Sequence, residues 1–142
     1  MHTFVLTYFI LLLPLPSVIL PAVILSSAVQ AQESDSQGNY YSNQTTVQAP
    51  NRFSKLSAGS LWRVVVNQLS CRQEPSLDSP VSRTYLADAL LEVEVYRGGS
   101  DEVLINPRDR YGKPWMPVRG ATLKDVCYVR ANSRYIEPVT LK

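Results

Sequence analysis

The chain has 142 residues and a formal net charge of +2, with 14 lysines and arginines against 12 aspartates and glutamates. This length suits one domain with accessory segments. The charges of both signs are interleaved along the sequence rather than gathered into a basic stretch, which argues against a nucleic-acid partner.

Residues 1–31 have the features of a secretory signal. Residues 4–25 carry no charged side chain, and Val29 and Ala31 are small residues at the spacing that a signal peptidase accepts. We expect cleavage after Ala31 and an exported protein, periplasmic or extracellular. The alternative is an uncleaved membrane anchor, because the apolar run is long enough to cross a bilayer, and only then is a membrane a partner.

Residues 32–56 are rich in Gln, Ser, Asn and Thr and contain few aliphatic side chains. Such a segment buries too little apolar surface to offset the entropy lost on ordering. We therefore expect a flexible linker over residues 32–56, followed by one folded domain over residues 57–142.

The first half of this domain shows two strand patterns. Residues 61–66 are β-branched and aromatic, which predicts a strand. Residues 66–76 lead into a Pro- and Ser-containing stretch that ends at residue 80, and we expect a long first loop there. Residues 89–96 alternate strictly, which predicts a strand with Glu92 and Glu94 on its solvent-exposed face. Only residues 85–91 carry a weak helical pattern.

The second half continues with short strands and turns. A glycine turn at residues 98–100 precedes a strand at 103–105. Residues 113–118 contain two prolines, which confine them to a sheet edge or a bulge. Residues 127–130 and 136–139 complete a set of five short strands, which predicts an all-β fold, a small barrel or a sandwich.

The two cysteines, Cys71 and Cys127, are most simply paired in a disulfide, because the chain is expected to be exported. The chain-entropy model gives such a long closed loop a stabilisation of roughly 4 kcal/mol. Two buried thiols are the alternative. A metal site is less compatible with the sequence, because two sulfurs and no histidine after residue 31 do not complete a tetrahedral shell.

The residues typical of several kinds of enzyme are missing from the expected mature chain. The single histidine, His2, lies in the signal, so a serine or cysteine nucleophile would lack its usual base. The glycine pair at residues 98–99 belongs to a turn rather than to a phosphate-binding loop. We expect no catalysis, no cofactor and no metal.

The order of these motifs resembles the bacterial SH3-like domain family. After its first strand the family has an Asn-x-Leu-x-x-Arg-x-x-Pro-Ser stretch, and Asp88 stands where it usually has glycine. The two cysteine-containing segments resemble those of small secreted members from cyanobacteria. The matching positions are Asn67, Leu69, Arg72, Pro75 and Ser76, then residues 91–95, residues 115–118, Tyr128-Val129 and Tyr135-Ile136.

The resemblance implies a five-stranded SH3-like barrel that binds peptides, often those of the cell wall, in an aromatic groove. The alternative for each aromatic residue is packing in the core. A second hypothesis is a structural envelope protein whose barrel docks on a protein partner. By position, the expected ligand-binding residues are Tyr85, Tyr96, Tyr111, Trp115, Arg119 and Tyr128.

Overall fold

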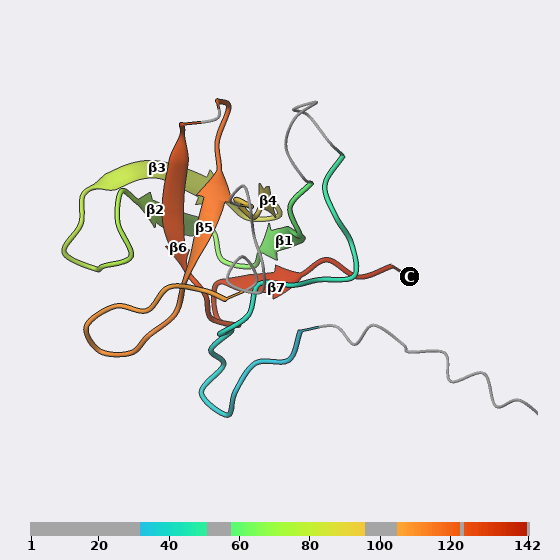
Figure 1. Cartoon of the computed structure of the whole chain (residues 1–142), viewed down its shortest axis with the longest axis horizontal. Coiled ribbons are helices and arrows are strands. Elements are labelled where there is room, and N and C mark those ends of the chain that lie inside the picture. The colour runs from blue at the N-terminus through green and yellow to red at the C-terminus, as the bar shows by residue number, and fades with distance from the viewer. Residues whose placement is uncertain (1–31, 51–57, 96–104, 123, 142) are drawn as a thin grey trace, which may run out of the picture.

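The computed structural model describes residues 32–50, 58–95, 105–122 and 124–141, which contain seven β-strands (Figure 1). No helix occurs in these ranges. The expected all-β class is therefore confirmed, with seven strands rather than five. The expected signal, residues 1–31, lies outside the described residues. The strands are β1 (Leu61–Val64), β2 (Gln68–Arg72), β3 (Val81–Leu86), β4 (Leu90–Glu92), β5 (Trp115–Arg119), β6 (Val126–Arg130) and β7 (Ile136–Pro138).

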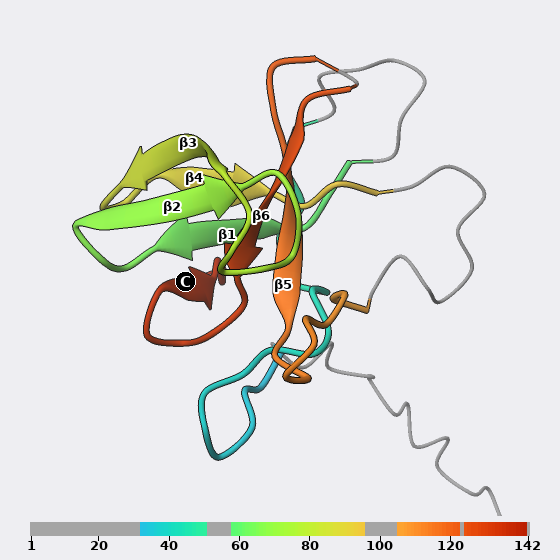
Figure 2. The same ribbon diagram turned by 90° about the vertical axis from the view of Figure 1, so that its left-hand side faces the viewer.

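The strands form two antiparallel sheets. One has the order β4-β1-β7 and the other β3-β2-β6-β5. β5 and β6 run across the direction of β1, which both views show (Figures 1 and 2). A bridge between Val93, just after β4, and Val118 of β5 links the sheets. The apolar faces of both sheets thus enclose one core.

Alternating side chains build this core, as the sequence pattern of β1 predicts. Trp62 and Val64 point inward from β1 and are buried, while Arg63 between them is exposed. The Trp62 ring meets Tyr40 edge-on, with the ring centroids 4.8 Å apart, a favoured aromatic geometry. The other buried core residues include Leu69 and Cys71 of β2, Met116 and Val118 of β5, and Cys127 and Val129 of β6.

Cys71 and Cys127 form the expected disulfide, which joins β2 to β6 with the two Cα atoms 5.5 Å apart. The cysteines are 56 residues apart in the sequence, so the bridge restricts a long loop of the unfolded chain. Structural disulfides are typical of oxidising compartments outside the cytosol.

The long first loop expected over residues 66–80 is wrong in its first half. β2 begins at Gln68, and only residues 73–80 connect it to β3, a strand that the sequence reading missed. In β2 the buried side chains of Leu69 and Cys71 alternate with polar residues, so these two are the only buried side chains of the strand.

The weak helical pattern at residues 85–91 is also wrong, because the chain turns there between β3 and β4. Asp88 has a φ of 65° in this turn, a conformation that favours glycine. Glycine is also the residue that the SH3-like family usually has at the matching position.

β5 confirms the expectation for the proline-containing segment. It is the outer strand of the four-stranded sheet, and Pro117 lies opposite Tyr128 of β6. Proline has no backbone N–H to donate, so an outer strand tolerates it. The Pro117 carbonyl accepts a hydrogen bond from the backbone N–H of Glu94 at 3.0 Å.

The flexible linker expected over residues 32–56 is wrong for its described part, residues 32–50. Tyr40 is in the core, and its backbone N–H donates to the carbonyl of Ala131 at 2.9 Å. Asn43 is buried, and its Nδ2 donates to Oδ1 of Asn106 at 2.9 Å. Buried amide side chains, rather than aliphatic ones, thus attach this segment, so the folded unit begins before residue 57.

Candidate functional site

An open pocket of about 530 Å³ lies between the two sheets, beside the turn that joins β3 to β4. We call it the β3–β4 pocket. Two of the residues expected to bind ligand, Tyr85 and Arg119, line it. Its lining residues include Leu61, Arg83, Tyr85, Leu90, Arg119, Gly120 and Asp125.

Leucines from the three-stranded sheet supply one wall. Leu61 begins β1, and Leu90 begins β4 with 59% of its surface exposed. The half-buried Tyr85 of β3 packs against the hydrophobic core. The pocket therefore offers an apolar surface that water covers in the free protein.

Arg83 of β3 places a cation in the same pocket. Its guanidinium pairs with Asp125, and Nη2 lies 2.9 Å from Sγ of Cys127. The guanidinium carbon is 5.9 Å from the centre of the Tyr85 ring. The Arg83 Nε is buried, and no described residue accepts a hydrogen bond from it.

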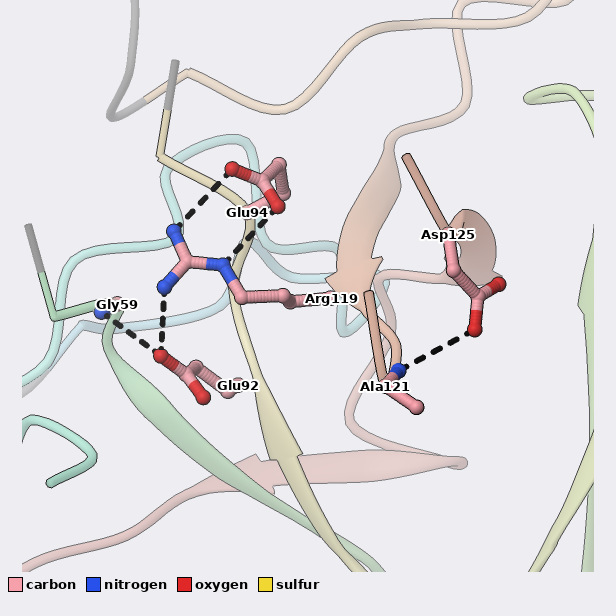
Figure 3. Close-up of polar contacts among 6 residues, drawn as sticks. All are labelled: Gly59, Glu92, Glu94, Arg119, Ala121 and Asp125. Carbon is pink, nitrogen blue, oxygen red and sulfur yellow. Dashed lines mark hydrogen bonds and ion pairs between the residues drawn. The ribbon is translucent and has the colours of Figure 1, made fainter. Parts of the chain in front are cut away.

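A buried cluster of charges forms the floor (Figure 3). Arg119 Nη1 donates to Glu92 Oε1 at 2.7 Å, while its Nε and Nη2 donate to the two oxygens of Glu94 at 3.0 and 3.1 Å. Burial acts to lower the pKa of Arg119, but the hydrogen bonds and charges of Glu94 and Glu92 outweigh it and raise the pKa. The guanidinium therefore stays charged, and its N–H groups bind these two carboxylates.

This cluster corrects the expectation that Glu92 and Glu94 face solvent. Both are buried, as are Leu91 and Val93 between and beside them. Residues 58–60 cover this part of β4, and Gly59 makes the close approach possible, because a Cβ there would lie 1.9 Å from the carbonyl oxygen of Val93. The charge of Arg119 also makes burial of two acids tolerable. Arg119, expected to meet a ligand carboxylate, instead binds carboxylates of its own chain.

The other expected ligand-binding residues do not join this pocket. Trp115 has only 1% of its surface exposed, and its Nε1 donates to Asp109 Oδ2 at 3.0 Å. It is therefore a buried residue rather than a stacking platform. Tyr111 is 68% exposed with Arg110 over its ring, and Tyr128 is half-buried on β6. Tyr96 lies outside the described residues.

Sequence reasoning missed Leu61, Leu90 and Arg83 as residues of the pocket. Arg83 was missed because β3 was not predicted. In this strand Arg83 and Tyr85 lie two residues apart and therefore share a face. Recognising that strand would have placed Arg83 beside Tyr85.

Comparison of the chain with protein-family models, with curated proteins and with solved structures gives no match. Among the residues that the structure describes, no helix is long and apolar enough to cross a membrane. The same residues contain no group of three or more His, Cys, Asp or Glu side chains placed to hold a metal ion.

Proposed function

We propose that the chain is an exported, non-catalytic SH3-like binding module that recognises an extended peptide, with the peptide part of the cell wall as its ligand. The observation that carries this proposal is the β3–β4 pocket, where exposed leucine, a tyrosine and an arginine meet on rigid strands. Shallow grooves of apolar and aromatic residues are a recurring way to bind extended peptides.

The apolar wall supplies the driving force in this proposal. A peptide that covers Leu90 and Leu61 removes apolar surface from water, at roughly 25 cal/mol for each Å² buried. The two strands that carry these leucines are paired with each other, with Leu61 opposite Glu92. The wall is therefore formed before the ligand arrives, which limits the entropy lost on binding.

Arg83 supplies the polar contact in this proposal. Its pair with Asp125 is partly exposed to solvent, so the guanidinium is accessible to an acidic group or a carbonyl of the peptide. Charge-assisted hydrogen bonds from arginine orient such groups. The buried charges of Arg119, Glu92 and Glu94 support the floor and are compensated within the protein.

Two exposed leucines give a matched test. Leu90 lines the pocket and Leu86 does not, although their exposed fractions are 59% and 61%. We expect Leu90→Lys to weaken co-sedimentation of the purified protein with peptidoglycan sacculi by about tenfold or more, and Leu86→Lys to bind as the wild type does. Near-ultraviolet circular dichroism checks that both variants are folded.

Two outcomes would contradict the proposal. Wild-type protein that does not sediment with sacculi rejects the cell-wall ligand, and equal binding by the two folded leucine variants rejects the pocket. Capture of an envelope protein by wild type and Leu86→Lys but not by Leu90→Lys would instead favour the docking hypothesis.

A further inference from the structure

A second open pocket, of about 520 Å³, lies where the N-terminal segment meets the loop before β5 and the turn after β6. We call it the Arg130 pocket. Its charged lining residues are all cations, Lys113, Arg130 and Arg134, and its neutral lining includes Gln37, Asn39 and Asn132. Its chemistry thus differs from that of the β3–β4 pocket.

The neutral amides hold this pocket in a fixed shape. Asn132 Nδ2 donates to the Gln37 carbonyl at 3.0 Å and to Asn39 Oδ1 at 3.1 Å. The same Asn39 oxygen accepts from Arg130 Nη2 at 3.2 Å. Gly38, with a φ of 83°, fits closely against Asn132 and Ser133, because a Cβ there would lie 2.4 Å from Ser133 Oγ. The wall is therefore built by specific contacts.

Within the described ranges, the hydrogen bonds of the three cations go to neutral groups. Arg130 donates to the Pro114 carbonyl at 2.5 Å and to Asn39, and Lys113 Nζ donates to Gln37 Oε1 at 3.0 Å. Arg134 makes its hydrogen bond through its backbone N–H, to Asn132 Oδ1 at 3.0 Å. In the described part of the chain, none of these three side chains is in an ion pair.

The nearest acids, Asp35 and Asp109, are engaged elsewhere. Asp35 accepts from the backbone N–H groups of Gln37 and Asn39 at 2.9 and 2.7 Å. Asp109 accepts from the Trp115 indole and from the backbone N–H groups of Tyr111 and Lys113. Both carboxylates lower the local positive potential, but neither occupies the pocket.

Arg130 is costly to keep in this position without a counter-charge. Burial lowers the pKa of its guanidinium, and Asp109 opposes this only through a longer-range interaction. Among the described residues, its contacts are the Pro114 carbonyl, Asn39 Oδ1 and the Trp115 ring, whose centre is 5.9 Å from the guanidinium carbon, and none of these carries a negative charge. An oxyanion in the pocket would supply that charge.

We infer that the Arg130 pocket binds an oxyanion, namely the carboxylate of a peptide or a free phosphate-like anion. Guanidinium groups bind both kinds of oxyanion through paired N–H donors. The inference goes beyond the function proposed above, because it concerns a different pocket and a different chemistry.

The test compares two probes that differ only in the charged group. The full exported chain, labelled with ¹⁵N, is titrated with N-acetyl-Ala-Ala as the free carboxylate and as its C-terminal amide, and separately with inorganic phosphate. We expect the carboxylate to shift the amide signals of Gln37, Asn132 and Arg134 in a saturable way, and the neutral amide to leave them in place. Binding of phosphate but not of the peptide would support the oxyanion site and identify a free anion as its source.

Two exposed cations provide the matched variants. We expect Arg134→Gln to raise the Kd for the bound anion by about three- to tenfold, and Lys124→Gln, outside the pocket, to leave it unchanged. Thermal unfolding verifies that both are folded. Equal shifts from carboxylate and amide, no shifts from either anion, or an unchanged Kd in folded Arg134→Gln would overturn the inference.

Discussion

The two pockets have nearly the same volume, about 530 and about 520 Å³, but their cations have different kinds of partner. In the β3–β4 pocket the deepest cation, Arg119, is bound by two acids of the same chain. In the Arg130 pocket the cations meet carbonyl and amide oxygens. Arg119, which two buried acids of its own chain bind, therefore acts in the structure, whereas the cations of the Arg130 pocket meet neutral partners and are available to an anion.

The largest expected effect comes from breaking the charge cluster of the first pocket. Arg119→Met removes the cation that pairs with the buried Glu92 and Glu94, which should lower the free energy of unfolding by about 3 to 5 kcal/mol. Urea unfolding with the disulfide intact measures this loss. Adding Glu92→Gln and Glu94→Gln to the same variant should recover part of it, because no uncompensated charge remains.

The matched control is the exposed pair of Arg63 and Glu137. Arg63→Met should cost less than about 1 kcal/mol, because solvent already screens that pair. Similar losses for Arg119→Met and Arg63→Met would contradict the role assigned to the buried cluster.

The disulfide, whose Cys127 Sγ lies 2.9 Å from Arg83 Nη2, should have the next largest effect. Reduction should lower the free energy of unfolding by about 2 to 5 kcal/mol, because it frees a long loop in the unfolded chain. Unfolding curves of oxidised and reduced protein measure the difference. Two titratable thiols in denatured protein from the native exported form would be the contrary finding.

A smaller effect should follow from loosening the second pocket. Asn39→Ala removes the oxygen that accepts from Arg130 and Asn132, and unsatisfied buried donors cost about 1 to 3 kcal/mol. Chemical unfolding of this variant beside Asn67→Ala, at an exposed position, tests the expectation. A loss no greater than that of Asn67→Ala would show that the amide contacts do not hold the pocket.

Asp109 gives the smallest effect, and it depends on pH. Burial acts to raise its pKa, but hydrogen bonds from Trp115, Lys113 and Tyr111 bring it below the usual 3.8. Because the folded pKa is lowered, the ionised group stabilises the fold above that usual value, and this contribution is lost as the pH falls further. The melting temperature of wild type should exceed that of Asp109→Asn from about pH 7 to about pH 4, and the difference should shrink towards about pH 2. A difference that stays constant or grows in acid would be inconsistent with this.

The features of the fold that were predictable are those set by local pattern or by covalent chemistry. The alternation in β1 gave its inward face, the two prolines placed β5 at an edge, and the pair of cysteines gave the disulfide.

The features that were not predictable depend on partners distant in the sequence. The alternating pattern predicted that Glu92 and Glu94 face solvent. It did not indicate their buried counter-ion, because Arg119 is 27 residues from Glu92 and 25 from Glu94. Residues 32–50 contain few aliphatic side chains, yet buried asparagines attach them, such as Asn43, whose partner Asn106 is 63 residues away. For the site, Tyr85 was anticipated as a lining residue, while Leu90 and Arg83 required the register of β3 and β4.

The most direct test is a titration of the ¹⁵N-labelled protein with soluble peptidoglycan stem peptides. We expect saturable shifts of the backbone amide signals of Leu61, Tyr85 and Gly120, which all line the pocket, in wild type and in Leu86→Lys, and no such shifts in folded Leu90→Lys. The absence of shifts in wild type, or the same shifts in Leu90→Lys, would contradict the claim that the β3–β4 pocket binds cell-wall peptide.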